Sequence, residues 1–361
     1  MDIFLKTKFK EEKIMKATER EIELINAADE GRRAYHGDLH NHAATGGTSD
    51  GARSLEHWKG ALEALYMDFA AILDHRQVRH MYLPEWEDGL FICGSEPGTA
   101  ITDITAEDPR LHYNMIFPSP KELEDLLEAH PEYEFTGGQE GHFKYPKFTK
   151  EAFGALIDEI KERGGFFVYP HPKQLMKSDD PLDYWFRDRT GIEIFYEDMR
   201  SESTKANYKL WCDLLALGKK VYACSGEDGH ACARDTALTV IYSDEKSSKG
   251  FIKYLSDGDF VCGSVGIKMC VGDTRMGGET ELEGKKLIVA VDDFHKSVKN
   301  PEHKYRLDLI TDAGIIASEE ISCTEPSYFA FDTEPLAFYR VEIFDQTQGL
   351  RIAIGNPIWN K

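Results

Sequence analysis

The sequence lacks a hydrophobic run long enough to cross a membrane, and it lacks the features of a secreted protein. No stretch approaches the roughly 20 apolar residues that span a bilayer. Residues 1–6 lead directly into charged residues, without the apolar core of a signal peptide. The 7 cysteines are odd in number and show no CxxC spacing, which favours reduced thiols over disulfides. We therefore expect a cytoplasmic protein with no membrane partner.

The sequence also lacks an excess of positive charge. Its 43 lysines and arginines stand against 64 aspartates and glutamates, a formal net charge of −21. Long nucleic acids bind mainly through neutralised phosphates, so no nucleic-acid partner is expected. A small anionic substrate stays open, because bound metal ions supply local positive charge. The 361 residues suffice for one large domain and one small one, and they leave the oligomeric state open.

What the sequence does have is a repeated pattern of helix, short apolar strand and polar strand end. Periodic apolar positions predict helices at about 11–31, 55–67, 150–163 and 203–217. Apolar runs predict buried strands at 69–73, 166–169 and 221–224, each followed closely by histidine or aspartate. In parallel α/β folds, functional groups gather at the carboxyl ends of strands. The pattern therefore predicts an α/β fold with one shared site.

The character of the sequence changes after residue 270. Short alternating strands, separated by turn residues, are expected at 286–291, 305–310, 328–331, 338–344 and 351–354. We interpret residues 271–361 as a small antiparallel β-sandwich, and residues 1–270, with the N-terminal helix 11–31, as the α/β domain. The segment 118–150 is too long for a simple connection and is predicted to be a lid or pocket wall.

Histidines alternate with other residues at the end of the first predicted strand. His36, Asp38, His40 and His42 share one face of a strand. Such crowding is costly in an ordinary core, where every polar group needs a partner. A divalent ion would serve two imidazoles, and Asp38 would orient one of them. The alternative is a solvent-facing, histidine-rich strand.

Further candidate ligands follow other short strands, and each has an ordinary structural explanation as well. Asp50 would equally serve as a turn residue or helix cap, Glu96 as a surface glutamate and His112 as an edge-strand histidine. Together, six histidines and three carboxylates form the candidate set: His40, His42, Asp50, His75, Glu96, His112, His171, Asp228 and His230. Mixed imidazole and carboxylate ligands favour zinc, manganese or iron over calcium or magnesium.

The ordered motifs HxDxHxH, SDG, DH, GxE, H, HP and DxH, between about residues 34 and 235, resemble the polymerase-and-histidinol-phosphatase (PHP) superfamily of metal-dependent phosphoesterases. The segments FYRVE at 338–342 and GNPIW at 355–359 are similar to a carbaryl-hydrolase-like and microcin-processing-like branch with a C-terminal β-domain. Three departures are the longer gap before SDG, at 45–47, Arg76 and Gln77 after His75 where relatives often have asparagine or aspartate, and Glu227 where serine is usual.

The resemblance implies a distorted (β/α)7 barrel holding two to three divalent ions. The ligands implied for the first ion are His40, His42, Glu96 and Asp228. The second ion would share Glu96 and add His112 and His171. The third would take Asp50, His75 and His230.

The implied reaction is hydrolysis by a water or hydroxide that bridges two ions, with metal charge stabilising the developing oxyanion. Glu96, Asp228 and Arg76 are the predicted catalytic residues. Arg76 is the first choice for binding a substrate anion, ahead of Lys173 and Arg234, and each of these also fits an ordinary surface charge. His80 and His142 are weaker candidates for the acid that protonates a leaving group.

Three functions compete. A phosphoesterase acting on a small phosphorylated molecule comes first. A carboxylic ester or amide hydrolase that uses the same cluster is the alternative, favoured by the C-terminal resemblance. A non-catalytic metal-binding or partner-binding protein is third.

Overall fold

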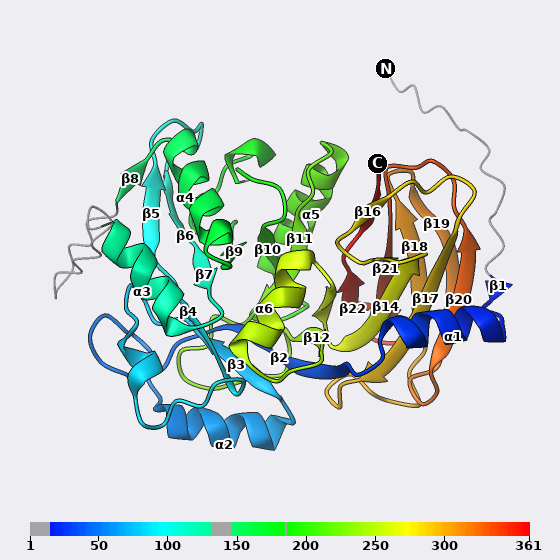
Figure 1. Ribbon diagram of the computed structural model, residues 1–361, viewed down its shortest axis with the longest axis horizontal. Helices are drawn as coiled ribbons and strands as arrows, with labels where there is room; N and C mark the ends of the chain where they lie inside the picture. The colour runs from blue at the N-terminus through cyan, green and yellow to red at the C-terminus, as the bar shows by residue number, and fades with distance from the viewer. Residues whose placement is uncertain (1–14, 131–145, 185) are drawn as a thin grey trace.

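Seven strands from the first part of the chain form a sheet that curls back on itself (Figure 1). The computed structural model describes residues 15–130, 146–184 and 186–361. The strands follow the spatial order β2 (Arg33–Asn41), β3 (Phe69–Ile72), β4 (Phe91–Ser95), β7 (Asn114–Ile116), β9 (Phe166–Tyr169), β10 (Gly191–Tyr196) and β11 (Tyr222–Gly226). Beyond β11, Gly229 bridges to Asn41 at the end of β2. The end of β11, the last strand of this sheet, therefore lies beside the end of β2, the first strand.

Most neighbouring strands in this sheet are parallel, and β7 is the exception. The groups β2–β3–β4 and β9–β10–β11 are parallel, whereas β7 is antiparallel to both β4 and β9. The chain reaches β7 from β6 (Arg110–His112), which pairs with β5 (Gly98–Ile101) in a small separate sheet with β8 (Lys147–Phe148). A parallel neighbour needs a long crossover. No helix separates β4 from β7, so the chain returns antiparallel.

Helices follow several of these strands, and their ends are set by capping residues. The helices beyond residue 50 are α2 (Leu55–Leu65), α3 (Pro120–Ala129), α4 (Lys150–Glu162), α5 (Glu202–Ala216) and α6 (Ser248–Asp257). In α4, the hydroxyl of Thr149 caps the first turn and accepts from the Ala152 N–H, while Phe153, Ile157 and Ile160 face the core. Among the described residues, no helix is long and apolar enough to cross a membrane.

The segment predicted to be a lid contains a packed helix. Pro120 stands in the first turn of α3, directly after Ser119, where its missing N–H costs nothing. Leu123 and Leu126 of α3 are buried in the main core. Residues 131–145 of the same segment lie outside the described residues. Residues 120–129 are therefore a packed helix, and the role of the segment as a lid or pocket wall stays a prediction.

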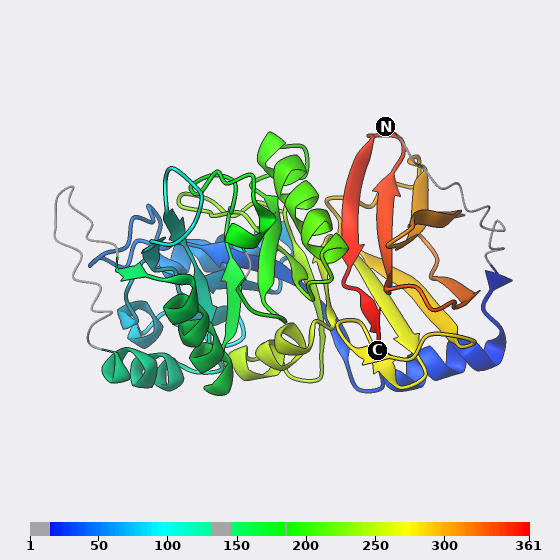
Figure 2. The ribbon, with the colours of Figure 1, turned by 90° about the horizontal axis from the view of Figure 1, so that it is seen from above.

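The sheet continues from β2 into strands from the end of the chain. Their order is β12 (Thr239–Ser243), β13 (Phe260–Gly263), β22 (Leu350–Gly355), β21 (Phe338–Asp345), β18 (Tyr305–Thr311) and β19 (Gly314–Ile321). A second sheet orders β1 (Met15–Lys16), β20 (Ser327–Asp332), β17 (Lys286–Phe294), β14 (Val265–Val271) and β15 (Thr274–Arg275). Short β16 (Glu279–Thr280) and β23 (Ile358–Asn360) pair beside β21. The strands of the two sheets lie side by side in Figure 2. An apolar core including Ile267, Val289, Leu307 and Val341 joins the two sheets.

The N-terminal helix packs on this second region. Thr18 and Glu21 form a capping box at the start of α1 (Glu19–Ala28), and Ile25 packs against Ile288 and Ala290 of β17. The helix expected at about 11–31 is confirmed for 19–28 only, since Met15–Lys16 form strand β1 and residues 29–31 form a turn. Residues 11–14 lie outside the described residues. The mixed α/β class is as predicted, and the division at residue 270 stays a prediction.

A buried ion-pair network joins α5 to the C-terminal strands. Arg340 on β21 is 4% exposed, and its Nη1 lies 2.9 Å from Oε1 of Glu342. The same glutamate pairs with Arg351 and accepts from the Tyr208 hydroxyl of α5. The Arg340 guanidinium also lies 4.5 Å from the Trp211 ring. Arg340 and Glu342, the two charged residues of the FYRVE segment, thus connect α5 to the C-terminal strands.

Substituting Glu342 by glutamine should destabilise the protein by about 3 kcal/mol, because it leaves the buried Arg340 without its counter-charge. Urea unfolding measures the effect through the midpoint at an unchanged slope. Glu319→Gln, on an exposed position of β19, should change stability by less than about 0.5 kcal/mol. Equal midpoints for the two variants would contradict a supporting role for the network.

Candidate metal centre

The structure brings together the nine side chains that the sequence nominated as ligands. They come from strand ends and the loops directly after them. His40 lies near the end of β2 and His42 directly after it, His75 follows β3, Glu96 follows β4, His112 ends β6, His171 follows β9, and Asp228 and His230 follow β11. Asp50 lies in the loop between β2 and α2. The curled sheet is what gathers these ends at one place.

Four of these side chains form a buried group. Nε2 of His40 and Nε2 of His42 lie 3.3 Å apart. Each also lies close to Oε2 of Glu96, at 3.3 and 3.2 Å, and to Oδ1 of Asp228, at 3.4 and 3.1 Å. Ligand atoms about 2.1 Å from a tetrahedral ion stand about 3.4 Å from one another. These donor atoms therefore fit a single divalent ion.

Glu96 links this group to two further histidines. Its Oε1 lies 2.8 Å from Nδ1 of His112 and 3.1 Å from Nε2 of His171. Its Oε2 is buried and, within the described residues, accepts no aligned hydrogen bond, although Nε2 of His40 and Nε2 of His42 lie 3.3 and 3.2 Å away. A buried carboxylate oxygen without a hydrogen bond is costly. One carboxylate thus offers a separate oxygen to each of two imidazole sets, as a bridging ligand would.

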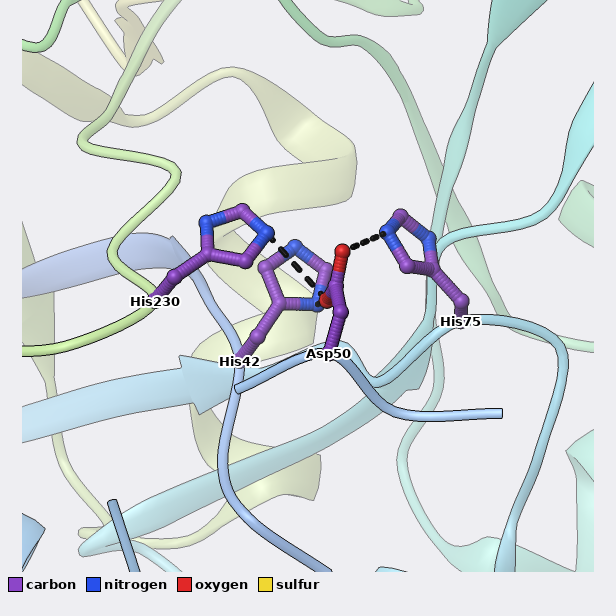
Figure 3. A group of neighbouring side chains, drawn as sticks. All are labelled: His42, Asp50, His75 and His230. Atoms are coloured by element: carbon purple, nitrogen blue, oxygen red, sulfur yellow. Dashed lines mark ion pairs between the residues drawn. The ribbon is translucent and has the colours of Figure 1, made fainter. Parts of the chain in front are cut away.

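The third group is more open than the first (Figure 3). Asp50 lies between His75 and His230, with Oδ2 3.3 Å from Nε2 of His75 and Oδ1 3.2 Å from Nε2 of His230. His42 completes this group. The Asp50 side chain is 53% exposed and that of His230 is 37% exposed, against 0% for His42. Solvent therefore reaches the cluster from this side.

The charges in the cluster depend on one another. Burial alone favours neutral Glu96, but the imidazoles of His112, His40 and His75 outweigh it and hold the pKa of Glu96 well below its usual value. Burial opposes a charge on His75 as well, yet Glu96 and Asp50 raise the pKa of His75 to about 9. Without metal, protonated imidazoles balance the carboxylates. A divalent ion would replace those protons.

Two side chains that the sequence analysis did not identify, Glu193 and Tyr196, hold the ligands in place. Glu193 in β10 is buried, and its Oε1 lies 3.1 Å from Nδ1 of the His40 ring. Its Oε2 accepts a hydrogen bond from the backbone N–H of His171, at 2.6 Å. The Tyr196 hydroxyl donates to Oδ2 of Asp228 at 3.1 Å. Glu193 stands within the apolar run GIEIFY, and a charged residue inside a buried strand is itself a signal that it has a partner.

The backbone near the cluster is unusual at three positions. His171, Asp228 and Arg76 have positive φ angles of 29°, 52° and 51°. Residues other than glycine rarely adopt this region, and they keep it only where the surroundings fix the conformation. Two of the three are nominated ligands, and the third adjoins His75.

Two residues of the first histidine motif do not reach the cluster. His36 lies against His295 and pairs with Asp293, at 3.2 Å. It precedes His40 by four residues, which places it about 13 Å away along a strand. Asp38 accepts from the backbone N–H groups of His40 and Glu227, and orients no imidazole. The expected pairing of two imidazoles, His40 and His42, is observed, but the prediction that Asp38 orients one of them was wrong.

The other nominated residues have varied surroundings. His80 is buried and its Nε2 contacts the carbonyl oxygen of Ile72, at 2.9 Å. Lys173 contacts the Ser178 carbonyl and the Tyr184 ring. Nε of Arg234 lies 3.7 Å from Oε2 of Glu227. Arg76 directly follows His75, and His142 lies outside the described residues.

The chain has distant likenesses among solved structures. No protein-family model and no curated protein matches it. An amidohydrolase from Chromobacterium violaceum shows 17% identity over 55% of this chain and 89% of that chain, with a TM-score of 0.39. A Bifidobacterium adolescentis protein, provisionally described as a metal-dependent phosphoesterase, shows 14% identity over 56% of this chain and 90% of that chain, with a TM-score of 0.35. The lesion-specific endonuclease Q of Pyrococcus furiosus shows 11% identity over 62% of this chain and 56% of that chain, with a TM-score of 0.42. Likeness at this level identifies neither a family nor a substrate.

Metal binding should release protons near neutral pH. Because the pKa of His75 is raised to about 9 in the metal-free protein, this imidazole is protonated at pH 7 and an ion must displace the proton. The apparent affinity should therefore rise from pH 7 to pH 9. Calorimetric titration with Zn²⁺ in buffers of different ionisation enthalpy counts the protons. The His75→Ala variant should release fewer protons when it binds Zn²⁺. A binding heat that does not depend on the buffer would contradict the prediction.

Glu193→Gln should weaken metal binding without removing a ligand. Partners of ligating histidines typically contribute about 10- to 100-fold to metal affinity, and the substitution removes the charge beside His40. Competition with a chromophoric chelator measures the affinity. Glu202→Gln, on the exposed start of α5, is the matched control. If both variants bind zinc like the wild type, Glu193 does not support the site.

Proposed function

We propose that the protein is a metal-dependent hydrolase, and specifically a phosphoesterase that cleaves a small phosphorylated substrate. The observation that carries the proposal is the position of Glu96, whose two oxygens face different sets of imidazoles. This arrangement supports a centre of two ions, with Asp50, His75 and His230 available for a third. With it we propose the finer fold, a distorted (β/α)7 PHP barrel followed by a β-sandwich.

Divalent ions held here would supply Lewis acidity, which activates a water molecule near neutral pH and stabilises negative charge on the substrate. The protein's own residues prepare the site for them. Glu193 fixes the His40 ring through Nδ1, which leaves Nε2 facing the buried group. Tyr196 fixes the Asp228 carboxylate in the same way. The buried side of the cluster excludes bulk water, while the Asp50 side admits the substrate.

The proposal assigns catalytic roles to Glu96, Asp228 and Arg76. Glu96 and Asp228 act by holding the ions. Arg76 would bind the substrate anion beside His75, a role its neighbouring position supports. The ligand set favours zinc, manganese or iron, and the net charge of −21 favours a small substrate over long nucleic acid.

The alternative is a carboxylic ester or amide hydrolase with the same ions. The resemblance of FYRVE at 338–342 and GNPIW at 355–359 to the carbaryl-hydrolase-like branch favours it. A carbonyl carbon and a phosphorus atom place similar demands on the cluster, since both develop oxyanion charge during attack. Only the choice of substrate separates the two.

A substrate panel tests the proposal. Protein purified without chelator is first assayed for ions per chain by elemental analysis. It is then given aryl phosphate monoesters and diesters and aryl acetates, with added Mn²⁺ or Zn²⁺. We expect turnover of the phosphoesters. His40→Ala should lower turnover by at least about 1,000-fold and lower the metal content, since it removes a ligand from the buried group.

The controls are His57→Ala, an exposed histidine of α2, and Cys212→Ala, and both should retain metal and activity. Turnover of acetates alone would favour the alternative. A fully metal-loaded protein that cleaves nothing would favour a binding protein, and normal activity in His40→Ala would remove the first ion site.

A further inference from the structure

Arginines near the cluster contrast with the acidity of the whole chain. Acidic residues outnumber basic ones by 64 to 43, so an arginine usually finds a carboxylate nearby. Within the described ranges, Arg53 and Arg79 are exposed and have no carboxylate within ion-pair distance. Both lie in segments that border the third group, Asp50, His75 and His230. Unpaired guanidinium groups at the open side of a candidate active site need an explanation.

Arg79 lies on the His75 side of that group. Its side chain packs along the loop at Gly46 and Gly47, where an added Cβ would come within 3.8 and 3.3 Å of its atoms. Both glycines have positive φ, 76° and 68°, which allows this close approach. The Thr48 hydroxyl ties the loop to the carbonyl of His75. The loop thus holds the Arg79 stem beside the cluster.

Arg53 lies on the His230 side. Its Nε donates to the carbonyl of Ala231, at 3.4 Å, directly after His230 in the chain. The backbone N–H of Ala52 donates to the carbonyl of His230, at 2.6 Å. The segment 50–53 is therefore fastened along the loop that carries His230. Figure 3 shows Asp50 between His230 and His75. Arg53 is bonded to the loop that carries His230, and Arg79 packs on the loop that is tied to His75.

The open group is where a substrate must enter. The buried group is closed, since His40 and His42 are 0% exposed, whereas Asp50 is 53% exposed. A guanidinium binds phosphate and carboxylate oxygens through paired N–H donors. Carboxylates of the protein would otherwise occupy such groups, and among the residues that the structure describes none lies within ion-pair distance of either arginine. The space beside each arginine is left for an anion from outside the chain.

We propose that Arg53 and Arg79 are specificity-determining residues that bind an oxyanion group, a phosphate or a carboxylate, on the substrate. The proposal rests on the proposed function, because it places the substrate at the same cluster. It adds that the preferred substrate carries an anionic group whichever ester bond is cleaved. Each arginine acts on substrate binding and holds no ion.

The test compares pairs of substrates that differ in one charge. Phenyl acetate is paired with 4-carboxyphenyl acetate, and phenyl phosphate with 4-carboxyphenyl phosphate. Wild-type enzyme should show a lower KM for the carboxylated member of the pair it cleaves. Arg53→Gln Arg79→Gln should abolish most of that preference, about 10-fold in KM, with kcat and metal content unchanged. The single variants assign the effect to one side or both.

Arg20→Gln is the matched control, because Arg20 is an exposed arginine of α1 with no carboxylate within ion-pair distance in the described part of the chain. It should keep the wild-type preference, which separates local binding from loss of net charge. Arg79→Lys keeps the charge without the paired donors and should recover part of the preference. A double variant with the wild-type KM ratio would overturn the proposal.

A protein that cleaves no ester would refute the proposed function and not this inference. Calorimetry with inorganic phosphate on metal-loaded protein then gives the answer. Phosphate should bind about 10-fold more weakly to the double variant than to wild type or Arg20→Gln. Equal affinities would overturn the role of both arginines, whatever the reaction.

Discussion

The burial of an ionised carboxylate is the constraint on which the rest of this structure depends. Glu96 is 0% exposed, and its pKa is held below the usual value only because imidazoles surround it. An uncompensated charge at this position would cost several kcal/mol. Positive charge must therefore be supplied, by protons on the histidines or by divalent ions. The histidines that carry these protons, or that would bind the ions, come from several strands that are far apart in the sequence.

The curled sheet supplies the imidazoles, and close backbone packing sets their distances. At Gly226, an added Cβ would lie 2.1 Å from Oε1 of Glu193 and 2.6 Å from Cβ of His40. Any larger residue would push β11 away from the carboxylate that orients His40. Just beyond it, Gly229 bridges to Asn41, which aligns the end of β11 with the end of β2. These two glycines, three residues apart, thus couple the closing of the sheet to the geometry of the ligands.

Sequence reasoning predicted several helices and the ligands, but it missed some local signals as well as the long-range contacts that support the site. The helix expected at 150–163 is observed at Lys150–Glu162, since capping and an apolar stripe both lie within it. Helix α6 was missed, although Ser247 caps its start and Gly258 ends it in a left-handed conformation. The nine nominated ligands meet because strand ends share an edge. Their support by Glu193 depends on the pairing of β10 between β9 and β11, which spacing alone does not reveal.

The three groups of ligands differ in how much the fold prepares them. The buried group uses strand-end side chains that are fixed before any ion arrives, so little conformational entropy remains to be lost on binding. Asp50 comes from a loop that includes two glycines in left-handed conformations, and its side chain is half exposed. Ordering that loop costs free energy, and water competes for its ligands. We infer that an ion at Asp50, His75 and His230 binds more weakly than one in the buried group. This position therefore suits an ion that engages fully only when a substrate covers the open side.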